Sequence, residues 1–167
     1  KEFEQKFAKY FGCNYAVAVF NGTVALELCI KTLGLKEGDE VIVTPRTFIA
    51  SASCCAYYGI KPVFVDVDIN TLNIDLDDLK KKINNKTKAI MCIHVLGTSA
   101  NMTELSNIAK KNKIILIEDT CESLGAKYNN KNLGTFGRFG TYSFYYSHQI
   151  TSGEGGMIVC NNKNDYH

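Results

Sequence analysis

A serine, a histidine and a glycine-rich turn stand close together near the end of the chain. The segment reads Ser143-Phe-Tyr-Tyr-Ser147-His148, and Gly153-Glu-Gly-Gly156 follows shortly after it. Imidazole exchanges a proton near neutral pH, so His148 is a candidate general base. Three glycines around one glutamate indicate a tight backbone path beside something bulky. The segment therefore predicts a site at which a proton is moved next to a large group.

A second candidate site follows the first predicted strand of the chain. Asn21-Gly22-Thr23 stands directly before a predicted helix. Gly22 allows a close backbone approach, the start of the helix offers free N–H groups, and Thr23 adds a hydroxyl. Together they form an anion cup that suits a phosphate. Taken alone, the same residues are better explained by an ordinary helix cap.

Adjacent carboxylates end a strongly apolar strand at Glu118-Asp119. Asp119 could hold a cationic ring nitrogen, and Glu122, three residues on, could face the same site. The alternative for Asp119 is a helix cap. His94 ends another apolar strand and is either a core histidine with satisfied hydrogen bonds or a wall of the site.

These side chains need a scaffold, and the hydrophobic pattern predicts one of alternating strands and helices. Strands are expected at 15–20, 40–44, 62–66, 88–95, 114–118, near 140–145 and at 156–160, and helices at 1–12, 24–33, 47–58, 75–83 and 101–112. Strands separated by helices imply crossover connections, so we expect an α/β fold with a mostly parallel sheet in a three-layer α/β/α arrangement. Ligands of such sheets bind at the carboxyl ends of the strands, where the candidates stand.

Composition places the chain among ordinary globular proteins. It has 167 residues, 46% of them hydrophobic and 22% charged, with a net charge of +2. These values exclude a disordered tail and a strongly basic nucleic-acid binder, and no apolar run is long enough for a membrane span. The seven cysteines are odd in number and form no CxxC pair, which favours free thiols in a reducing cytoplasm and no metal site.

Six motifs occur in order: Asn21-Gly-Thr, Thr44-Pro-Arg-Thr-Phe48, Pro62-Val-Phe-Val-Asp66-Val-Asp68, Glu118-Asp119 with Gly125-Ala126, Gly134-Thr-Phe-Gly137 and Gly153-Glu-Gly-Gly156. Together they resemble the DegT/StrS family of pyridoxal-phosphate-dependent nucleotide-sugar aminotransferases, which have the fold-type I architecture. The resemblance runs from about residue 15 to about residue 162. It implies that residues 1–167 are an incomplete cofactor-binding large domain, without the N-terminal arm and the C-terminal small domain. It also implies a cytoplasmic homodimer with its active sites at the subunit interface.

The resemblance also assigns roles to individual residues around the cofactor. Thr23, the backbone N–H of Val24 and the hydroxyl of Ser143 should hold the cofactor phosphate. Phe48 occupies the position whose aromatic ring stacks on the pyridine. Arg46 and the loop near Thr98 are expected to line the pocket as well.

Two acidic residues complete the assignment around the pyridine ring. Asp119 should pair with the pyridine nitrogen and so keep the ring an electron sink. Glu122 stands where many members carry glutamine, near the phenolic oxygen of the ring. A carboxylate there would repel a phenolate, so we expect Glu122 to be protonated or turned away.

His148 is the larger departure from the family pattern. Family aminotransferases have a lysine there, which binds the cofactor covalently, and this chain has no lysine between Lys131 and Lys163. The exchange of lysine for histidine marks a sub-branch that resembles sugar 3-dehydratases, and Cys121 and Leu124 also fit that sub-branch. Cys121 could ligate an iron–sulfur cluster, but no cysteine spacing here supports one.

In that sub-branch, pyridoxamine phosphate condenses with the 4-keto group of a nucleotide-linked 4-keto-6-deoxyhexose. His148 would remove a proton from the methylene carbon of the cofactor, the 3-hydroxyl would leave, and a 3-deoxy sugar would result. One alternative is a nucleotide-sugar aminotransferase in which another group replaces the lysine. A second is a non-catalytic cofactor-binding homologue. A Rossmann-type dinucleotide binder is disfavoured because no G-x-G-x-x-G follows the first strand.

Overall fold

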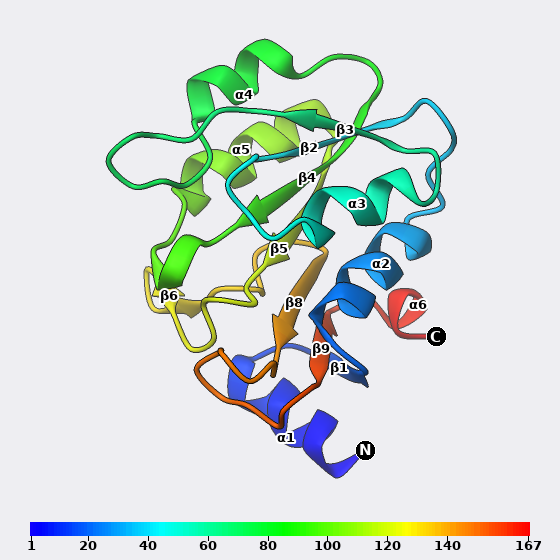
Figure 1. Cartoon of the computed structure of the whole chain (residues 1–167), viewed down its shortest axis with the longest axis vertical. Coiled ribbons are helices and arrows are strands. Elements are labelled where there is room, and N and C mark those ends of the chain that lie inside the picture. Colours follow the sequence, from blue (N-terminus) through cyan, green and yellow to red (C-terminus); the bar gives the residue numbers. More distant parts are fainter.

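A seven-stranded sheet forms the centre of the computed structural model, which describes all residues from 1 to 167 (Figure 1). Its strands are β1 (Tyr15–Val19), β2 (Glu40–Val43), β3 (Lys61–Phe64), β4 (Thr87–Ile93), β5 (Ile115–Asp119), β8 (Phe139–Ser143) and β9 (Gly156–Cys160). The strand order is β1-β9-β8-β5-β4-β2-β3. Strand β9 is antiparallel to both of its neighbours, and every other pairing is parallel. The predicted mostly parallel sheet is confirmed.

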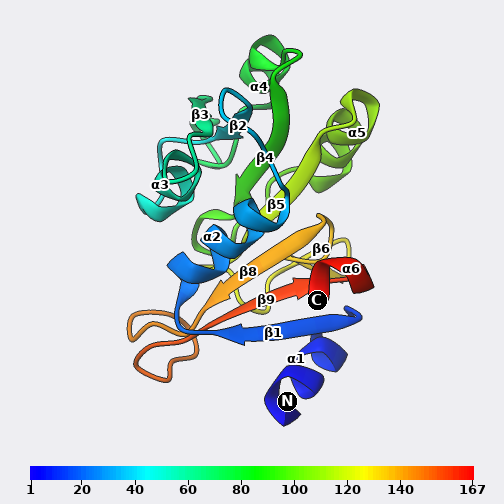
Figure 2. The ribbon, with the colours of Figure 1, turned by 90° about the vertical axis from the view of Figure 1, so that its right-hand side faces the viewer.

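Helices cover both faces of this sheet and confirm the three-layer arrangement (Figure 2). They are α1 (Glu2–Phe11), α2 (Gly22–Thr32), α3 (Ala50–Ala56), α4 (Leu76–Lys82), α5 (Met102–Asn112) and α6 (Lys163–Tyr166), with a short 3-10 helix η1 (Val95–Gly97). Helices α2 and α3 pack on one face, while α4 and α5 pack on the other, where α1 also lies. None of the helices has the length and apolar character that a membrane crossing requires.

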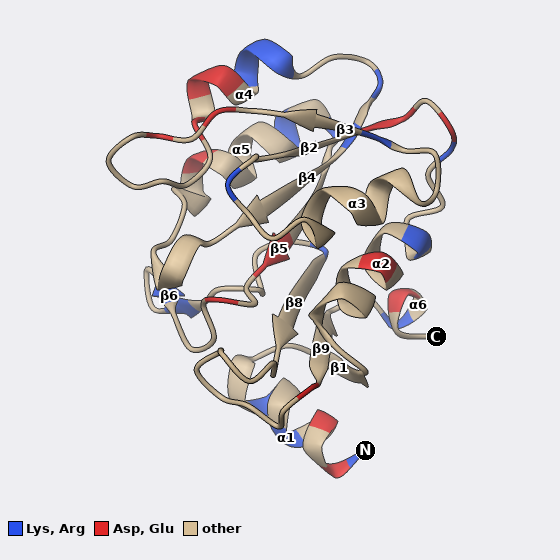
Figure 3. Cartoon of the chain, viewed as in Figure 1, with Lys and Arg blue, Asp and Glu red and all other residues tan.

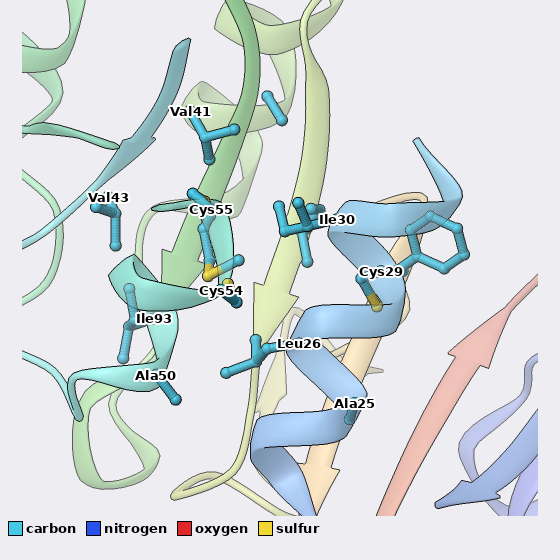
Figure 4. Close-up of a cluster of buried hydrophobic side chains, with 14 of the residues drawn as sticks. Ala25, Leu26, Cys29, Ile30, Val41, Val43, Ala50, Cys54, Cys55 and Ile93 are labelled. Atoms are coloured by element: carbon cyan, nitrogen blue, oxygen red, sulfur yellow. The ribbon is translucent and has the colours of Figure 1, made fainter. Parts of the chain in front are cut away.

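The layer between the sheet and helices α2 and α3 is the largest buried apolar cluster (Figure 4). Its members include Leu26 and Ile30 of α2 and Val41 of β2. Cysteines Cys54 and Cys55 of α3 are fully buried in the same layer, and all seven cysteines of the chain are free thiols. This agrees with the expectation of unpaired thiols, and five of the seven cysteines are buried.

Helix α1 shows how sequence spacing builds the opposite layer. Phe7 and Phe11 lie four residues apart on one face of the helix and stack at 4.4 Å between ring centroids. Both are buried against Tyr142 of β8. The helix ends at Gly12, whose φ of 76° is left-handed.

Three local features differ from the sequence prediction. Helix α3 begins at Ala50 rather than at residue 47, so residues 45–49 form a loop after β2. A small hairpin of β6 (Lys127–Tyr128) and β7 (Lys131–Asn132) was not predicted, although Asn129-Asn130, both with positive φ, is the turn it needs. Helix α6 was also missed, and an ion pair between Arg138 and Asp165 fixes it to the sheet.

Candidate active site

A cavity of about 630 Å³ opens at the carboxyl ends of β1, β2, β4, β5 and β8. Its lining residues are Asn21, Gly22, Thr23, Leu26, Arg46, Thr47, Phe48, Ala50, Ser51, Ile93, Val95, Leu96, Asp119, Cys121, Glu122, Ser143, Tyr145, Ser147, His148 and Glu154. Segments that are far apart in the sequence therefore meet at the edge of the sheet where parallel strands end. All the predicted site residues line this cavity except Val24. Arg46 and the loop before Thr98, through Leu96, line it too.

The start of helix α2 forms one end of the cavity. Asn21 caps the helix by accepting a hydrogen bond from the Val24 N–H at 2.9 Å. The amides of Gly22 and Thr23 belong to the first turn, which has no carbonyl of its own helix to bind. Because the Val24 amide serves the cap, the contact of Val24 with a phosphate stays a prediction.

Ser143, at the end of β8, lies directly against the start of α2. A Cβ atom placed on Gly22 would come within 2.9 Å of the Ser143 Cβ and 3.0 Å of the Cys121 Sγ, so only glycine permits this approach. The Ser143 Oγ accepts a hydrogen bond from the Tyr145 N–H, which leaves its own proton free for a ligand. Thr23 and Ser143 thus line the cavity beside the free amides of the helix, and their hydroxyls add to a donor set for an anion.

Asp119 forms the other polar end of the cavity. Its side chain is buried, with Oδ2 accepting from the Ser51 Oγ at 2.9 Å and Oδ1 accepting from the Cys121 N–H at 3.2 Å. No helix begins at Asp119, so the helix-cap alternative is excluded. Burial, and then the charge of Asp119, raise the pKa of the Cys121 thiol, which stays neutral at neutral pH. No group of three or more His, Cys, Asp or Glu side chains is arranged to hold a metal ion.

Glu118 precedes Asp119 in β5, so its side chain points to the opposite face of the sheet. Figure 3 shows acidic positions at the end of β5. The fully buried carboxylate of Glu118 accepts three backbone N–H groups of the Gly134–Gly137 turn at 2.6 to 2.8 Å. The His94 Nε2 lies 3.1 Å from the same carboxylate, and the His94 Nδ1 accepts from the Ala100 N–H. His94 is therefore a satisfied core histidine and not a wall of the site. Sequence reasoning missed this role of Glu118.

His148 lies in the loop between β8 and β9 and is half-buried at the cavity. Its backbone N–H donates to the Tyr145 carbonyl at 3.0 Å, and its ring lies 6.2 Å from the Tyr145 ring. The neighbouring Gln149 side chain donates to the Glu122 carbonyl at 2.6 Å, which ties the loop to the segment after β5. No lysine lines the cavity. Among its lining side chains, His148 is the one suited to moving a proton near neutral pH.

Exposed apolar side chains surround the mouth of the cavity. Phe48 is 72% exposed, its neighbour Ile49 72% and Leu96 75%. Leu96 also holds a φ of 49°, a left-handed conformation that is uncommon for leucine and typical of functional sites. Phe48 thus stands at the open side of the cavity, and its stacking role stays a prediction. Glu122 is exposed and lines the same cavity, so the prediction for its carboxylate also stays open.

Comparison with known proteins places nearly the whole chain in one family. The model of the DegT/DnrJ/EryC1/StrS aminotransferase family matches residues 1–166. The GDP-perosamine synthase of Escherichia coli O157:H7 is 47% identical over 166 residues, which are 99% of this chain and 46% of that protein. The GDP-4-keto-6-deoxy-D-mannose 3-dehydratase of Escherichia coli O55:H7 is 45% identical over 173 residues, covering 100% of this chain and 45% of that protein. The chain spans slightly less than half the length of these relatives.

Solved structures of that dehydratase superimpose closely on the chain. The E. coli enzyme with bound hydrated pyridoxal phosphate has a TM-score of 0.96 and 45% identity, over 99% of this chain and 44% of its own. A variant with histidine replaced by asparagine and with bound GDP-perosamine has a TM-score of 0.96 and 44% identity, over 99% and 45%. In a further variant with the same values, an adjacent serine and histidine are replaced by asparagine and lysine.

Proposed function

The chain belongs to the DegT/DnrJ/EryC1/StrS aminotransferase family, and from this we propose that it removes the 3-hydroxyl of a nucleotide-linked 4-keto-6-deoxy sugar with the help of pyridoxal or pyridoxamine phosphate. The observation that carries the proposal is His148 in a cavity that no lysine lines. The dehydratase relatives support it further, because a solved variant of one replaces an adjacent serine and histidine. Ser147-His148 is the one Ser-His pair in this sequence.

The donor set of the cavity fits a phosphorylated pyridine. Thr23 and Ser143, with the free amides of the first turn of α2, would hold the phosphate. The Asp119 carboxylate would pair with the protonated ring nitrogen, and Phe48 would cover the ring from the open side. When bound, this cofactor supplies an electron sink for the bonds that break at the sugar.

His148 is the residue that moves protons in this proposal. As a neutral imidazole it takes up a proton at a ring nitrogen, and the resulting imidazolium can deliver that proton to the hydroxyl that leaves as water. The hydrogen bond from the His148 N–H to Tyr145, and the bond from Gln149 to Glu122, keep its loop across the cavity. Because imidazole forms no covalent bond to the cofactor, the other residues of the cavity must retain the cofactor through non-covalent contacts.

Arg46 is the candidate contact for the diphosphate of the nucleotide. It is the one arginine of a cavity that also holds the carboxylates of Asp119, Glu122 and Glu154. Arg46 takes part in none of the ion pairs within the chain, so its guanidinium remains available to an anion. A substrate that carries phosphate would find its opposite charge here.

A homodimer and a cytoplasmic location are parts of the same proposal. The exposed Phe48, Ile49 and Leu96 at the cavity mouth would be covered by a second copy of the chain. Seven unpaired cysteines suit a reducing compartment. Light scattering coupled to size exclusion would report the mass of a dimer, and a monomer at every concentration would exclude it.

A second candidate function is transamination of the same class of sugar. It is favoured by the GDP-perosamine synthase of E. coli, which is 47% identical to this chain. In that case a lysine from outside the cavity, or another group, would have to do the work of the cofactor-binding lysine that other family members carry at the position of His148.

A product analysis distinguishes the candidates. The purified protein is incubated with pyridoxamine phosphate and GDP-4-keto-6-deoxymannose, and the sugar is identified by mass spectrometry. Dehydration gives a 3-deoxy sugar that His148→Asn no longer forms, whereas His167→Asn, outside the cavity, forms it at the wild-type rate. A 4-amino sugar would support transamination instead, and a protein that binds the cofactor without any product would be a non-catalytic homologue.

A further inference from the structure

Ser51 is a cavity residue that neither the family motifs nor the proposed chemistry assigns. It lies in the first turn of α3, and its side chain is fully buried. Its Oγ lies 2.9 Å from the Asp119 Oδ2 and 2.8 Å from the Thr47 Oγ1. Three side chains, from the loop after β2, from helix α3 and from the end of strand β5, are thereby linked in a row.

The direction of these hydrogen bonds follows from the number of protons available. An ionised carboxylate only accepts hydrogen bonds, so the Ser51 hydroxyl must donate its single proton to Asp119. The Thr47 hydroxyl is then the donor to the Ser51 Oγ. Both hydroxyls therefore point their protons toward the Asp119 carboxylate, which is the arrangement that supports a negative charge.

Asp119 is held from two sides by this arrangement. Ser51 reaches Oδ2 from α3, and the Cys121 N–H reaches Oδ1 from the segment after β5. The terminal torsion of an aspartate is soft, so a carboxylate bound on one side alone would rotate freely. With both oxygens engaged, the plane of the carboxylate is fixed toward the cavity.

The packing of α3 does not require this hydroxyl. Ala50, Cys54 and Cys55 bury the helix in the apolar layer, and none of them contributes a partner to Asp119. A helical serine usually bonds back to its own backbone or to water, whereas Ser51 bonds to a strand end 68 residues away in the sequence. Thr47 ties the same row to the loop that carries Phe48.

We infer that Ser51 is a positioning residue, which orients the Asp119 carboxylate toward the ring nitrogen of the cofactor. The inference rests on the proposed function, because it requires that Asp119 meets such a nitrogen. The new element is the role of α3: the Ser51 hydroxyl, itself hydrogen-bonded to Thr47, sets the orientation in which the Asp119 carboxylate meets that nitrogen.

The test compares two ligands that differ at one ring atom. Binding of pyridoxamine phosphate is measured by fluorescence titration, beside binding of an analogue that carries CH in place of the ring nitrogen. The measured quantity is the ratio of the two affinities, so a general loss of folded protein cancels. The variants are Ser51→Ala, Ser51→Thr and Thr47→Val, with Ser53→Ala as the matched control on the same helix, half-buried and outside the cavity lining.

We expect Ser51→Ala to bind pyridoxamine phosphate about tenfold more weakly, because a hydrogen bond to a charged group is lost, and to bind the analogue as the wild type does. Thr47→Val should show a smaller loss in the same direction. Ser51→Thr and Ser53→Ala should keep the wild-type ratio. An unchanged ratio in Ser51→Ala would overturn the inference, whether both affinities fall together or neither falls. Failure of the wild type to bind either ligand would instead overturn the proposed function itself.

Discussion

The approach of helix α2 to strand β8 makes Gly22→Ala the most informative single substitution. Gly22 is the first residue of α2, and its backbone has no special conformation that only glycine adopts. Helix propensity alone favours alanine over glycine by up to about 1 kcal/mol. The structure predicts the opposite effect, because the added Cβ would lie 2.9 Å from the Ser143 Cβ and 3.0 Å from the Cys121 Sγ.

Ser143 cannot move easily to make room. Ser143 ends β8, which is bonded on both sides by β5 and β9, and its side chain is buried. Overpacking of this kind costs about 1 to 3 kcal/mol, which exceeds the gain in propensity. We expect a net loss of up to about 2 kcal/mol in the free energy of unfolding. A displaced Ser143 hydroxyl should also weaken phosphate binding by about tenfold, as for one lost hydrogen bond to a charged group.

The assay combines urea unfolding with a titration of pyridoxal phosphate. In Ser143→Gly the contact with the Ser143 side chain is removed while the contact with the Cys121 Sγ remains, so Gly22→Ala should cost less stability in that variant than in the wild type. This smaller cost separates steric contact from an effect on the helix alone. If Gly22→Ala matched the wild type in both stability and affinity for pyridoxal phosphate, the close contact between Gly22 and Ser143 would not determine the shape of the phosphate site.

Three further predictions concern ionisable groups. Glu118→Ala should lower the free energy of unfolding by about 3 to 5 kcal/mol in urea titrations, because the buried N–H groups of the Gly134–Gly137 turn lose their acceptor; a loss below about 1 kcal/mol would contradict that reading. Hydrogen bonds from the side chains of Asn84 and Lys61 lower the pKa of Glu40, so its stabilisation is complete above the unfolded-state value of about 4.3 and is lost as the pH falls through the folded-state value. Glu40→Gln should therefore flatten the acid-induced fall in stability, and an unchanged pH profile would refute this. Burial beside Asp119 raises the pKa of Cys121, so iodoacetamide should alkylate this thiol at pH 8 more slowly than free cysteine, as followed by peptide mass analysis; equal rates would show an accessible thiolate.

The sequence pattern predicted that the candidate site residues would lie together, because each ends or follows a strand. Asp119 and Ser143 end β5 and β8, Thr23 and His148 follow β1 and β8, and all four line one cavity at the carboxyl ends of the strands. Such positions can be found from hydrophobic periodicity and a few glycine-rich motifs. The three-layer fold follows from the same alternation of strands and helices.

The partners of those residues could not be found in this way. Ser51 and Asp119 are 68 residues apart, and Glu118 meets His94 across 24 residues, so only the folded sheet brings them together. Helix α3 begins after Phe48 because the loop that holds Phe48 and Ile49 stays outside the core, which no helical spacing reveals. The hydrogen bond from the Val24 N–H to the Asn21 side chain could not be predicted either. Several residue types can cap the start of a helix, so the sequence does not show which side chain accepts from this amide.

We propose that His148 stands where the family's aminotransferases carry a covalent lysine, and that it serves as a base. The most direct measurement is the intact mass of the protein after loading with pyridoxal phosphate and reduction with borohydride. We expect an unmodified mass for the wild type and the mass of one attached cofactor for His148→Lys. A stoichiometric adduct on a lysine of the wild-type protein would contradict it.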